Sequence, residues 1–217
     1  MSPSLVTLFA SFLAAATGEY SFQTPDGQGV VIVREDWGAY NGAGTNDVHL
    51  KLLWFRKYQV RAVRFVQSSI SDNGIMALLG FRELNSIWFQ SCPNVTSGGL
   101  ATLISWMSGS LLDVTAEFTG SQGWLPSLRR HRDLTVLDCT YARLSAADCA
   151  TLQSLQKLVC LSIGYGEISP EATDSICRLK SLSNLRLNNV RIRQADADKL
   201  NRLPGVDKII WIDRTGK

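Results

Sequence analysis

One phrase recurs along this chain at an interval of about 24 residues, and it constrains the fold more than any other feature. Apolar residues fill its first, fourth and sixth places, as in Leu134-x-x-Leu137-x-Cys139, Leu158-x-x-Leu161-x-Ile163 and Leu182-x-x-Leu185-x-Leu187. The same frame occurs upstream at Val60, Val63 and Phe65 and at Leu84, Ile87 and Phe89. A fixed period of this size is typical of stacked repeats, in which one unit buries its apolar face only against its neighbours.

Within each unit the spacing of apolar residues changes from that of a strand to that of a helix. Leu161 and Ile163 are two positions apart, which places both side chains on one face of a strand. Ile176, Leu179 and Leu182 are three apart, as on one side of a helical turn. We therefore predict an α/β fold in which every unit contributes a short strand and a helix to one shared interior.

Polar residues mark the start of each predicted helix. Ser145-x-x-Asp148 has the form of a capping box, and Ser169-Pro170-Glu171 places a cap, a first-turn proline and an acidic residue in order. Ser71-Asp72 and Thr96-Ser97 fill the same place in earlier units. The capping signals agree with the repeat frame, so both point to the same unit boundaries.

Two steps between units depart from the regular period. The step from Ile87 to Val114 is longer than the others, the step from Val114 to Leu137 is shorter, and the second of these units carries Pro126. We expect a looser helical side there, without a domain break. The last strand is predicted from Lys208 to Ile212, with Ile209 and Trp211 in register with the strand before it.

The chain is predicted to have three parts. Residues 58–217 form the repeat body, and residues 19–57 form a capping strand and helix, with the strand near Val30–Val33, a glycine-rich turn at 41–44 and the helix near Asp47–Tyr58. Residues 1–18 include an apolar run that fits a signal-peptide core or an N-terminal extension. The run is too short to span a membrane. Export and a cytoplasmic location both remain open.

Composition narrows the possible partners. The 217 residues are 45% hydrophobic and 19% charged, which favours a folded body, and the net charge of +3 gives no electrostatic reason to expect nucleic acid or a membrane surface. The five cysteines include no pair with zinc or redox spacing. Cys139 is expected to face inward, and a bridge between Cys149 and Cys177 is left open.

These repeats resemble leucine-rich repeats, most closely the short type of about 24 residues found in bacterial proteins and in cysteine-containing repeats. The turn phrases beginning at Ile70 and Val95 carry the same resemblance, which covers about residues 58 to 213. It implies a solenoid with a curved parallel sheet on its concave face and helices on its convex face. The chain departs from the family in one respect, because only Cys92 occupies the position where many members keep asparagine or cysteine.

No catalytic set can be recognised. The two histidines, His49 and His131, lie in a presumed capping helix and in the Arg129–Arg132 cluster, and no nucleophile elbow, phosphate loop or zinc-protease motif occurs. For the arginine cluster, a solvated helix face is favoured over an anion site. We therefore predict a protein that is not an enzyme and needs no cofactor or metal.

The functional surface predicted from strand geometry is the sheet face turned away from the interior. It is expected to bind a protein partner of unknown identity, since Trp and Arg are frequent anchors in interfaces. The alternative is a structural or assembly component held through its convex helices. The predicted partner-binding residues are Arg64, Trp88, Gln90, Thr115, Glu117, Asp138, Thr140, Ser162, Arg186, Asn188 and Ile210.

Overall fold

A computed structural model describes residues 19–23, 30–34, 39–43, 61–107, 111–117, 123–140, 144–205 and 207–212. For the three strands before residue 61, for Thr140 and for residues 208–212 only the backbone is described. The predicted capping helix near 47–58, His49 and the 1–18 segment lie outside these residues.

The described strands form one sheet arranged in chain order. β1 (Glu19–Gln23), β2 (Val30–Arg34) and β3 (Ala39–Ala43) are antiparallel neighbours, and β3 lies parallel to β4 (Ala62–Val66). The remaining strands follow in parallel: β5 (Ser86–Gln90), β6 (Asp113–Glu117), β7 (Val136–Thr140), β8 (Cys160–Gly164), β10 (Asn184–Ile192) and β11 (Asp207–Ile212). The short β9 (Glu167–Ile168) pairs with the end of β10.

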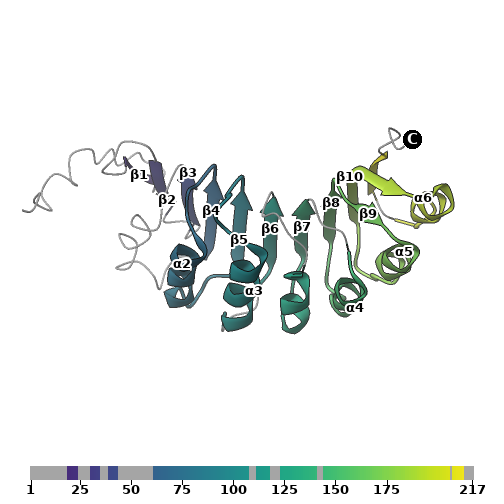
Figure 1. Cartoon of the computed structure of the whole chain (residues 1–217), viewed down its shortest axis with the longest axis horizontal. Helices are drawn as coiled ribbons and strands as arrows, with labels where there is room; N and C mark the ends of the chain where they lie inside the picture. Colours follow the sequence, from purple (N-terminus) through teal and green to yellow (C-terminus); the bar gives the residue numbers. More distant parts are fainter. Residues whose placement is uncertain are drawn as a thin grey trace, which may run out of the picture.

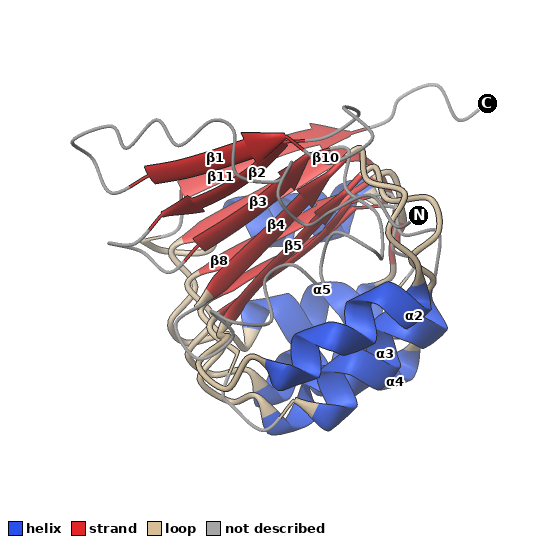
Figure 2. Cartoon of the chain, turned by 90° about the vertical axis from the view of Figure 1, so that its left-hand side faces the viewer, coloured by secondary structure: helices blue, strands red, loops and turns tan. Residues whose placement is uncertain are grey.

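Helices follow the parallel strands and lie on one side of the sheet (Figures 1 and 2). They are α2 (Asp72–Ile75), η3 (Met76–Gly80), α3 (Ser97–Trp106), η4 (Leu125–Arg130), α4 (Ala146–Ser154), α5 (Pro170–Cys177) and α6 (Gln194–Asn201). The predicted caps at Ser71, Thr96, Ser145 and Ser169 are confirmed, and Ser145 and Asp148 form the full capping box. Where Pro126 lies, the turn is the 3-10 helix η4.

The strand register predicted from the repeats is confirmed. Val63 pairs with Ile87, Leu137 with Leu161, and Leu161 with Leu185. The two irregular steps are also as predicted, because Val114 pairs with Ile87 on one side and with Leu137 on the other. The inward residues, Cys139 included, are buried between the sheet and the helices in one hydrophobic core.

The region before the repeat body differs from the prediction. Three strands are formed where one was expected, and residues 41–43, predicted as a turn, belong to β3. The glycine at 42 is tolerated in this strand because its backbone pairs with Val31 on one side of β3. Local turn propensity is therefore overridden by hydrogen bonding within the sheet.

The register of the last strand also differs from the prediction. Arg186 pairs with Ile209 and Leu187 with Ile210, so the step from β10 to β11 is one residue shorter than the repeat period. The turn before β11 contains Gly205 at a φ of +67°, a backbone conformation that glycine adopts at little cost. The predicted pairing of Ile209 with the inward residue Leu185 is therefore wrong.

Four residues at matching places in their units share the same strained backbone conformation. Gln67, Ser91, Tyr165 and Asn189 have φ angles between 48° and 54°. The first three directly follow β4, β5 and β8, and Asn189 lies at the register shift within β10. The backbone N–H of Gln67, Ser91 and Tyr165 donates to a carbonyl of the following unit at 2.9–3.3 Å. One residue later, the buried thiol of Cys92 donates to the carbonyl oxygen of Phe65 at 3.6 Å. These bonds tie the turns of adjacent units together.

Candidate functional site

The sheet face opposite the helices, which we call the outer face, carries a row of aligned side chains. Strand pairing places six of them at the same level on successive strands, because residues paired between parallel strands share a face. We call this row the outer strip, and it consists of Arg64, Trp88, Thr115, Asp138, Ser162 and Arg186.

The members of the outer strip differ in accessibility. Arg64 and Arg186 are exposed, and Trp88, Asp138 and Ser162 are half-buried. Thr115 is only 4% exposed, so this predicted site residue offers almost no surface to a partner. Its neighbours Trp88 and Asp138 are both larger, and a short side chain between two larger ones is shielded from solvent.

Among the other predicted site residues, the flanking Gln90 and Glu117 are half-buried and Asn188 is exposed. Ile210 is level with the inward residue Leu187, not with Arg186 as expected. The side chains of Thr140 and Ile210 lie outside the described residues. The strand register therefore aligns Arg64, Trp88, Asp138, Ser162 and Arg186 as predicted, and it does not align Ile210 with them.

At the β4–β5 end of the outer strip, a cation stacks on an aromatic ring. The guanidinium carbon of Arg64 lies 4.0 Å from the centroid of the Trp88 ring. Such a pair contributes about 0.5–1 kcal/mol at an exposed site, and it holds the guanidinium in one orientation. The indole Nε1 of Trp88 is buried and has no hydrogen-bond partner among the residues that the structure describes.

The middle of the outer face is acidic. Burial is the main cause that raises the pKa of Asp113. A hydrogen bond from Ser86 lowers this pKa in part, and the negative charge of Asp138 raises it further. Burial likewise raises the pKa of Glu117, again with the Asp138 charge, while Gln90 and Arg64 oppose the shift. The Asp138 carboxylate on β7 is therefore close enough to repel both carboxyl groups of β6. The Oδ1 atom of Asp113 is buried and accepts no hydrogen bond from the described part of the chain.

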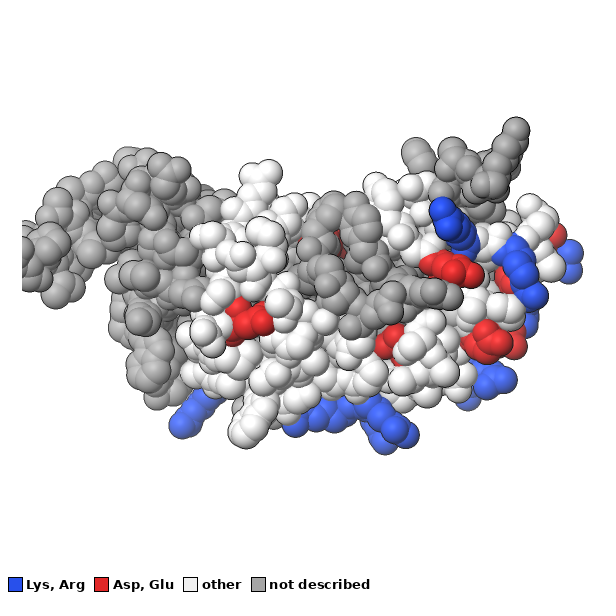
Figure 3. Space-filling view, in the orientation of Figure 1, with Lys and Arg blue, Asp and Glu red and all other residues white. Residues whose placement is uncertain are grey.

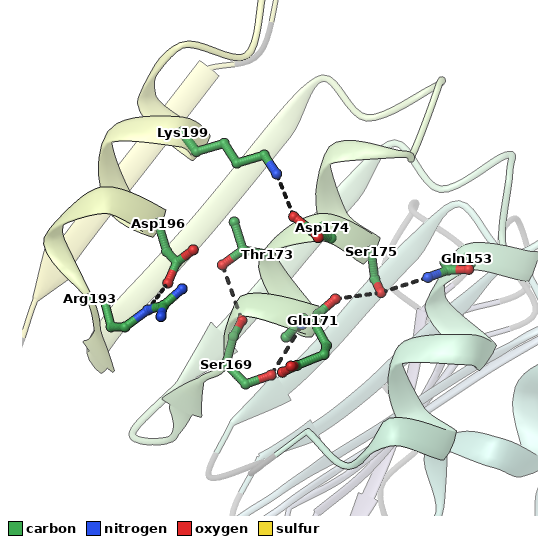
Figure 4. Close-up of polar contacts among 10 residues, drawn as sticks. Gln153, Ser169, Glu171, Thr173, Asp174, Ser175, Arg193, Asp196 and Lys199 are labelled. Carbon is green, nitrogen blue, oxygen red and sulfur yellow. Dashed lines mark hydrogen bonds and ion pairs between the residues drawn. The ribbon is translucent and has the colours of Figure 1, made fainter.

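The opposite side of the molecule holds its units together through polar contacts. Lys157 Nζ lies 2.5 Å from Asp133 Oδ1, and Lys199 forms the same kind of ion pair with Asp174 of the preceding unit. Figure 4 shows the Lys199–Asp174 contact between α6 and α5, and the bond from Gln153 to the hydroxyl of Ser175. Side chains that pair between successive units in this way serve to stabilise the stack.

Basic side chains gather along the helical edge of the view in Figure 3. As the sequence indicated for the arginine cluster, Arg129, Arg130 and Arg132 are exposed. His131, between them, is 2% exposed and was not expected to be buried. Its Nδ1 accepts from the backbone N–H of Leu111 at 3.2 Å, and its Nε2 lies 3.1 Å from the carbonyl oxygen of Ile104 and 3.4 Å from Arg130 Nε.

The cysteines are free thiols, and no bridge joins Cys149 to Cys177. Burial raises the pKa of the Cys139 thiol far above its ordinary value, which makes it a poor nucleophile. Within the described part of the chain, no cluster of His, Cys, Asp or Glu has the makings of a metal site. None of the helices described there is long and apolar enough to cross a membrane.

The chain was compared with known proteins at the levels of sequence and structure. No protein-family model and no curated protein matches the sequence. Among solved structures, an internalin from Listeria monocytogenes is similar, with 17% sequence identity and a TM-score of 0.47 over 74% of this chain. The chain spans about half of that protein, 49% of its length. The internalin is a leucine-rich repeat protein.

Proposed function

We propose that this chain is a leucine-rich repeat solenoid that binds another protein on its outer face. The Arg64–Trp88 stack is the observation that carries this proposal. An exposed guanidinium held 4.0 Å above an indole is a large contact surface with restricted motion. Trp and Arg are the residue types most often responsible for binding energy in interfaces.

The sheet beneath the stack favours binding for a second reason. Each outer-strip residue extends from a strand that is hydrogen-bonded to its neighbours, and the core below it is fully buried. A rigid platform loses little conformational entropy when a partner docks. The row also extends across six strands, which suits an extended contact with one partner.

Substitution of the anchors tests the proposal. A protein partner would be recovered from the native source, and its affinity for the Trp88→Ala and Arg186→Ala variants would be compared with its affinity for the wild-type chain. We expect each variant to bind the partner about tenfold or more weakly. The matched control is Trp106→Ala, because Trp106 is 73% exposed on α3, on the helical side. Unchanged affinity in both outer-face variants would remove this face from the proposal.

The helical side is the second candidate surface, for a structural or assembly component. The exposed Trp106 favours it, together with the irregular units on either side of β6. Chemical crosslinks to the same partner decide between the two surfaces. Crosslinks confined to α3 and η4, with none to the strands, would select the helical side. Loss of binding in Trp106→Ala alone would do the same.

A further inference from the structure

We propose that the outer face recognises a protein segment in which a lysine or arginine is flanked on both sides by carboxylates. This inference rests on the proposed function and specifies the chemistry of the partner. Arg64 and Arg186 would each receive one of the partner's carboxylates. The partner's cation would lie between them, over β6 and β7.

Charged side chains occur in a fixed order along the outer face of the sheet. Strand pairing brings Arg64 on β4, the carboxyl groups of β6 and β7, and Arg186 on β10 into one sequence: positive, negative, positive. An interface is specific when the partner presents the opposite potential at each point, and like charges in contact are costly. A partner with the order negative, positive, negative is therefore favoured over one with the reverse order.

Two hydrogen-bonding groups that have no partner within the described ranges give the second step, and this observation is independent of the net charge. The indole N–H of Trp88 is a donor, and Asp113 Oδ1 is an acceptor. They lie on the adjacent strands β5 and β6, on the same face, and both are shielded from bulk water. Buried polar atoms without partners are costly in a native protein and are commonly satisfied by a ligand or by ordered water. A carboxylate beside Arg64 and a cation beside Asp113 would satisfy one atom each.

The geometry of the stack gives the third step. The guanidinium carbon of Arg64 lies 4.0 Å from the centroid of the Trp88 ring, and a guanidinium can bind a carboxylate in a bidentate manner. At the other end, Arg186 is exposed on β10, and the described residues include no ion pair to it. Parallel strands are about 4.8 Å apart, so the partner's charges would be separated by about 10–14 Å.

A peptide selection tests the inference with a defined probe. A phage library of random twelve-residue peptides would be panned against the immobilised full-length chain, and the enriched peptides would be synthesised for affinity measurement. We expect enriched peptides to carry Lys or Arg between two acidic residues. Their affinity should fall about tenfold for Glu117→Lys and for Arg64→Glu. A peptide with its central cation replaced by glutamate should bind Glu117→Lys better than it binds the wild-type chain.

Control variants separate this inference from the proposed function. Arg178→Glu and Asp198→Lys reverse charges on the helical side and should leave affinity unchanged. Peptides that bind Trp88→Ala more weakly than the wild-type chain, but bind every charge-reversed variant with unchanged affinity, would overturn the inference and leave the proposed function intact. Peptides that ignore Trp88→Ala as well, or a selection with no enrichment, would contradict both.

The salt dependence of binding to the wild-type chain provides a test that needs no variant. Contacts between exposed charges weaken when the Debye length falls from about 10 Å at 0.1 M salt to about 3 Å at 1 M. We expect the selected peptides to bind several-fold more weakly at the higher salt concentration. Equal affinity at both concentrations would contradict a charge-based contact even if a charge-reversed variant failed to fold.

Discussion

His131 shows how one side chain can stabilise the join between two units. It lies directly after η4, yet it reaches the backbone that leads from α3 into β6. Its ring accepts from the N–H of Leu111 and contacts the carbonyl oxygen of Ile104, and Arg130 also donates to that carbonyl at 3.0 Å. A helix end without such partners would leave buried carbonyl groups unsatisfied.

Replacing this ring tests its structural role. His131→Phe keeps a ring of similar shape and removes both hydrogen-bonding nitrogens, so we expect the free energy of unfolding to fall by about 2–3 kcal/mol. Urea denaturation measures the change, and Arg132→Ala, an exposed neighbour, should change it by about 0.5 kcal/mol or less. Equal stability of His131→Phe and the wild-type chain would show that water replaces the lost bonds.

Gly98 and Gly99 are adjacent at the start of α3 and differ in the space around them, so they can be compared directly. A Cβ atom on Gly99 would lie 1.9 Å from the Asp72 carboxylate, which accepts from Thr96 N at 2.7 Å and from Thr96 Oγ1 at 2.6 Å. A Cβ on Gly98 would meet only Thr96 Oγ1, at 3.6 Å. Gly99 therefore leaves room for a carboxylate from the preceding unit at the N-terminus of α3.

We expect opposite effects from the two alanine substitutions. Gly99→Ala should lower the free energy of unfolding by about 1–3 kcal/mol, because Asp72 must give up its bonds. Gly98→Ala should raise it by about 0.4–1 kcal/mol through the lower entropy of the unfolded chain. In an Asp72→Ala background the penalty of Gly99→Ala should largely disappear. Thermal denaturation of the wild-type chain, the two single variants and the double variant measures this coupling. An unchanged penalty in that background would exclude the carboxylate as its cause.

Residue-scale roles were predictable where a local signal exists. The serine and threonine caps and the inward position of Cys139 follow from spacing alone. The buried contacts of His131 depend on residues far away in the sequence, Leu111 and Ile104, and nothing in the surrounding arginines indicates them. The Arg64–Trp88 stack was predictable in principle, since both residues occupy the same place in adjacent units.

At the scale of a single element, β6 carries an electrostatic cost. Asp113 and Glu117 are at its two ends, and the Asp138 charge on the neighbouring β7 acts on both. Because the folded pKa of Asp113 lies above its ordinary value of 3.8, the folded chain holds a proton that the unfolded chain has already released. The resulting stability is present below the ordinary pKa and is lost as pH rises through the raised pKa.

An amide at this position should remove the part of the pH dependence that comes from Asp113. We expect Asp113→Asn, compared with the wild-type chain, to gain relative stability as the pH rises from about 4 to about 7. Urea denaturation at several pH values measures the difference, with Asp198→Asn on α6 as the control. A relative stability that falls over the same pH range would mean that the ionised carboxylate stabilises the fold.

Elements were predictable where their residues follow the repeat. The strands β4 to β8 and the helices between them match the apolar spacing, including the irregular steps around β6. β3 was missed because its glycine and asparagine resemble a turn, while the bonds that hold it come from β2 and β4. β11 was placed one residue out of register because its exact position depends on the turn at Gly205.

For the whole molecule, chain order and spatial order coincide. Apart from the short β9, each strand pairs with its neighbours along the chain, so internal strands have two neighbours and β11 has one among the described strands. In such a stack the free energy of opening is a sum over units and the contacts between adjacent units. Terminal units therefore open more readily than internal ones.

Hydrogen exchange should show this gradient. We expect the backbone amides of β5 to β8 to be protected about a hundredfold more than those of β11, because opening β11 disrupts a single interface. Hydrogen–deuterium exchange with mass spectrometry measures the difference. Uniform protection from β4 to β11 would instead indicate a body that unfolds only as a whole.

The equal step from β7 to β8 and from β8 to β10 also bears on how a chain like this can evolve. Removing residues 137–160 would bring Leu161 directly after Val136, where Leu137 now stands, and every downstream side chain would keep its side of the sheet. A deletion longer or shorter by a single position would have to be absorbed by the connecting turn, as the shorter step from β6 to β7 is. Genes for such a chain can therefore shorten or lengthen by whole units without redesign of the remainder.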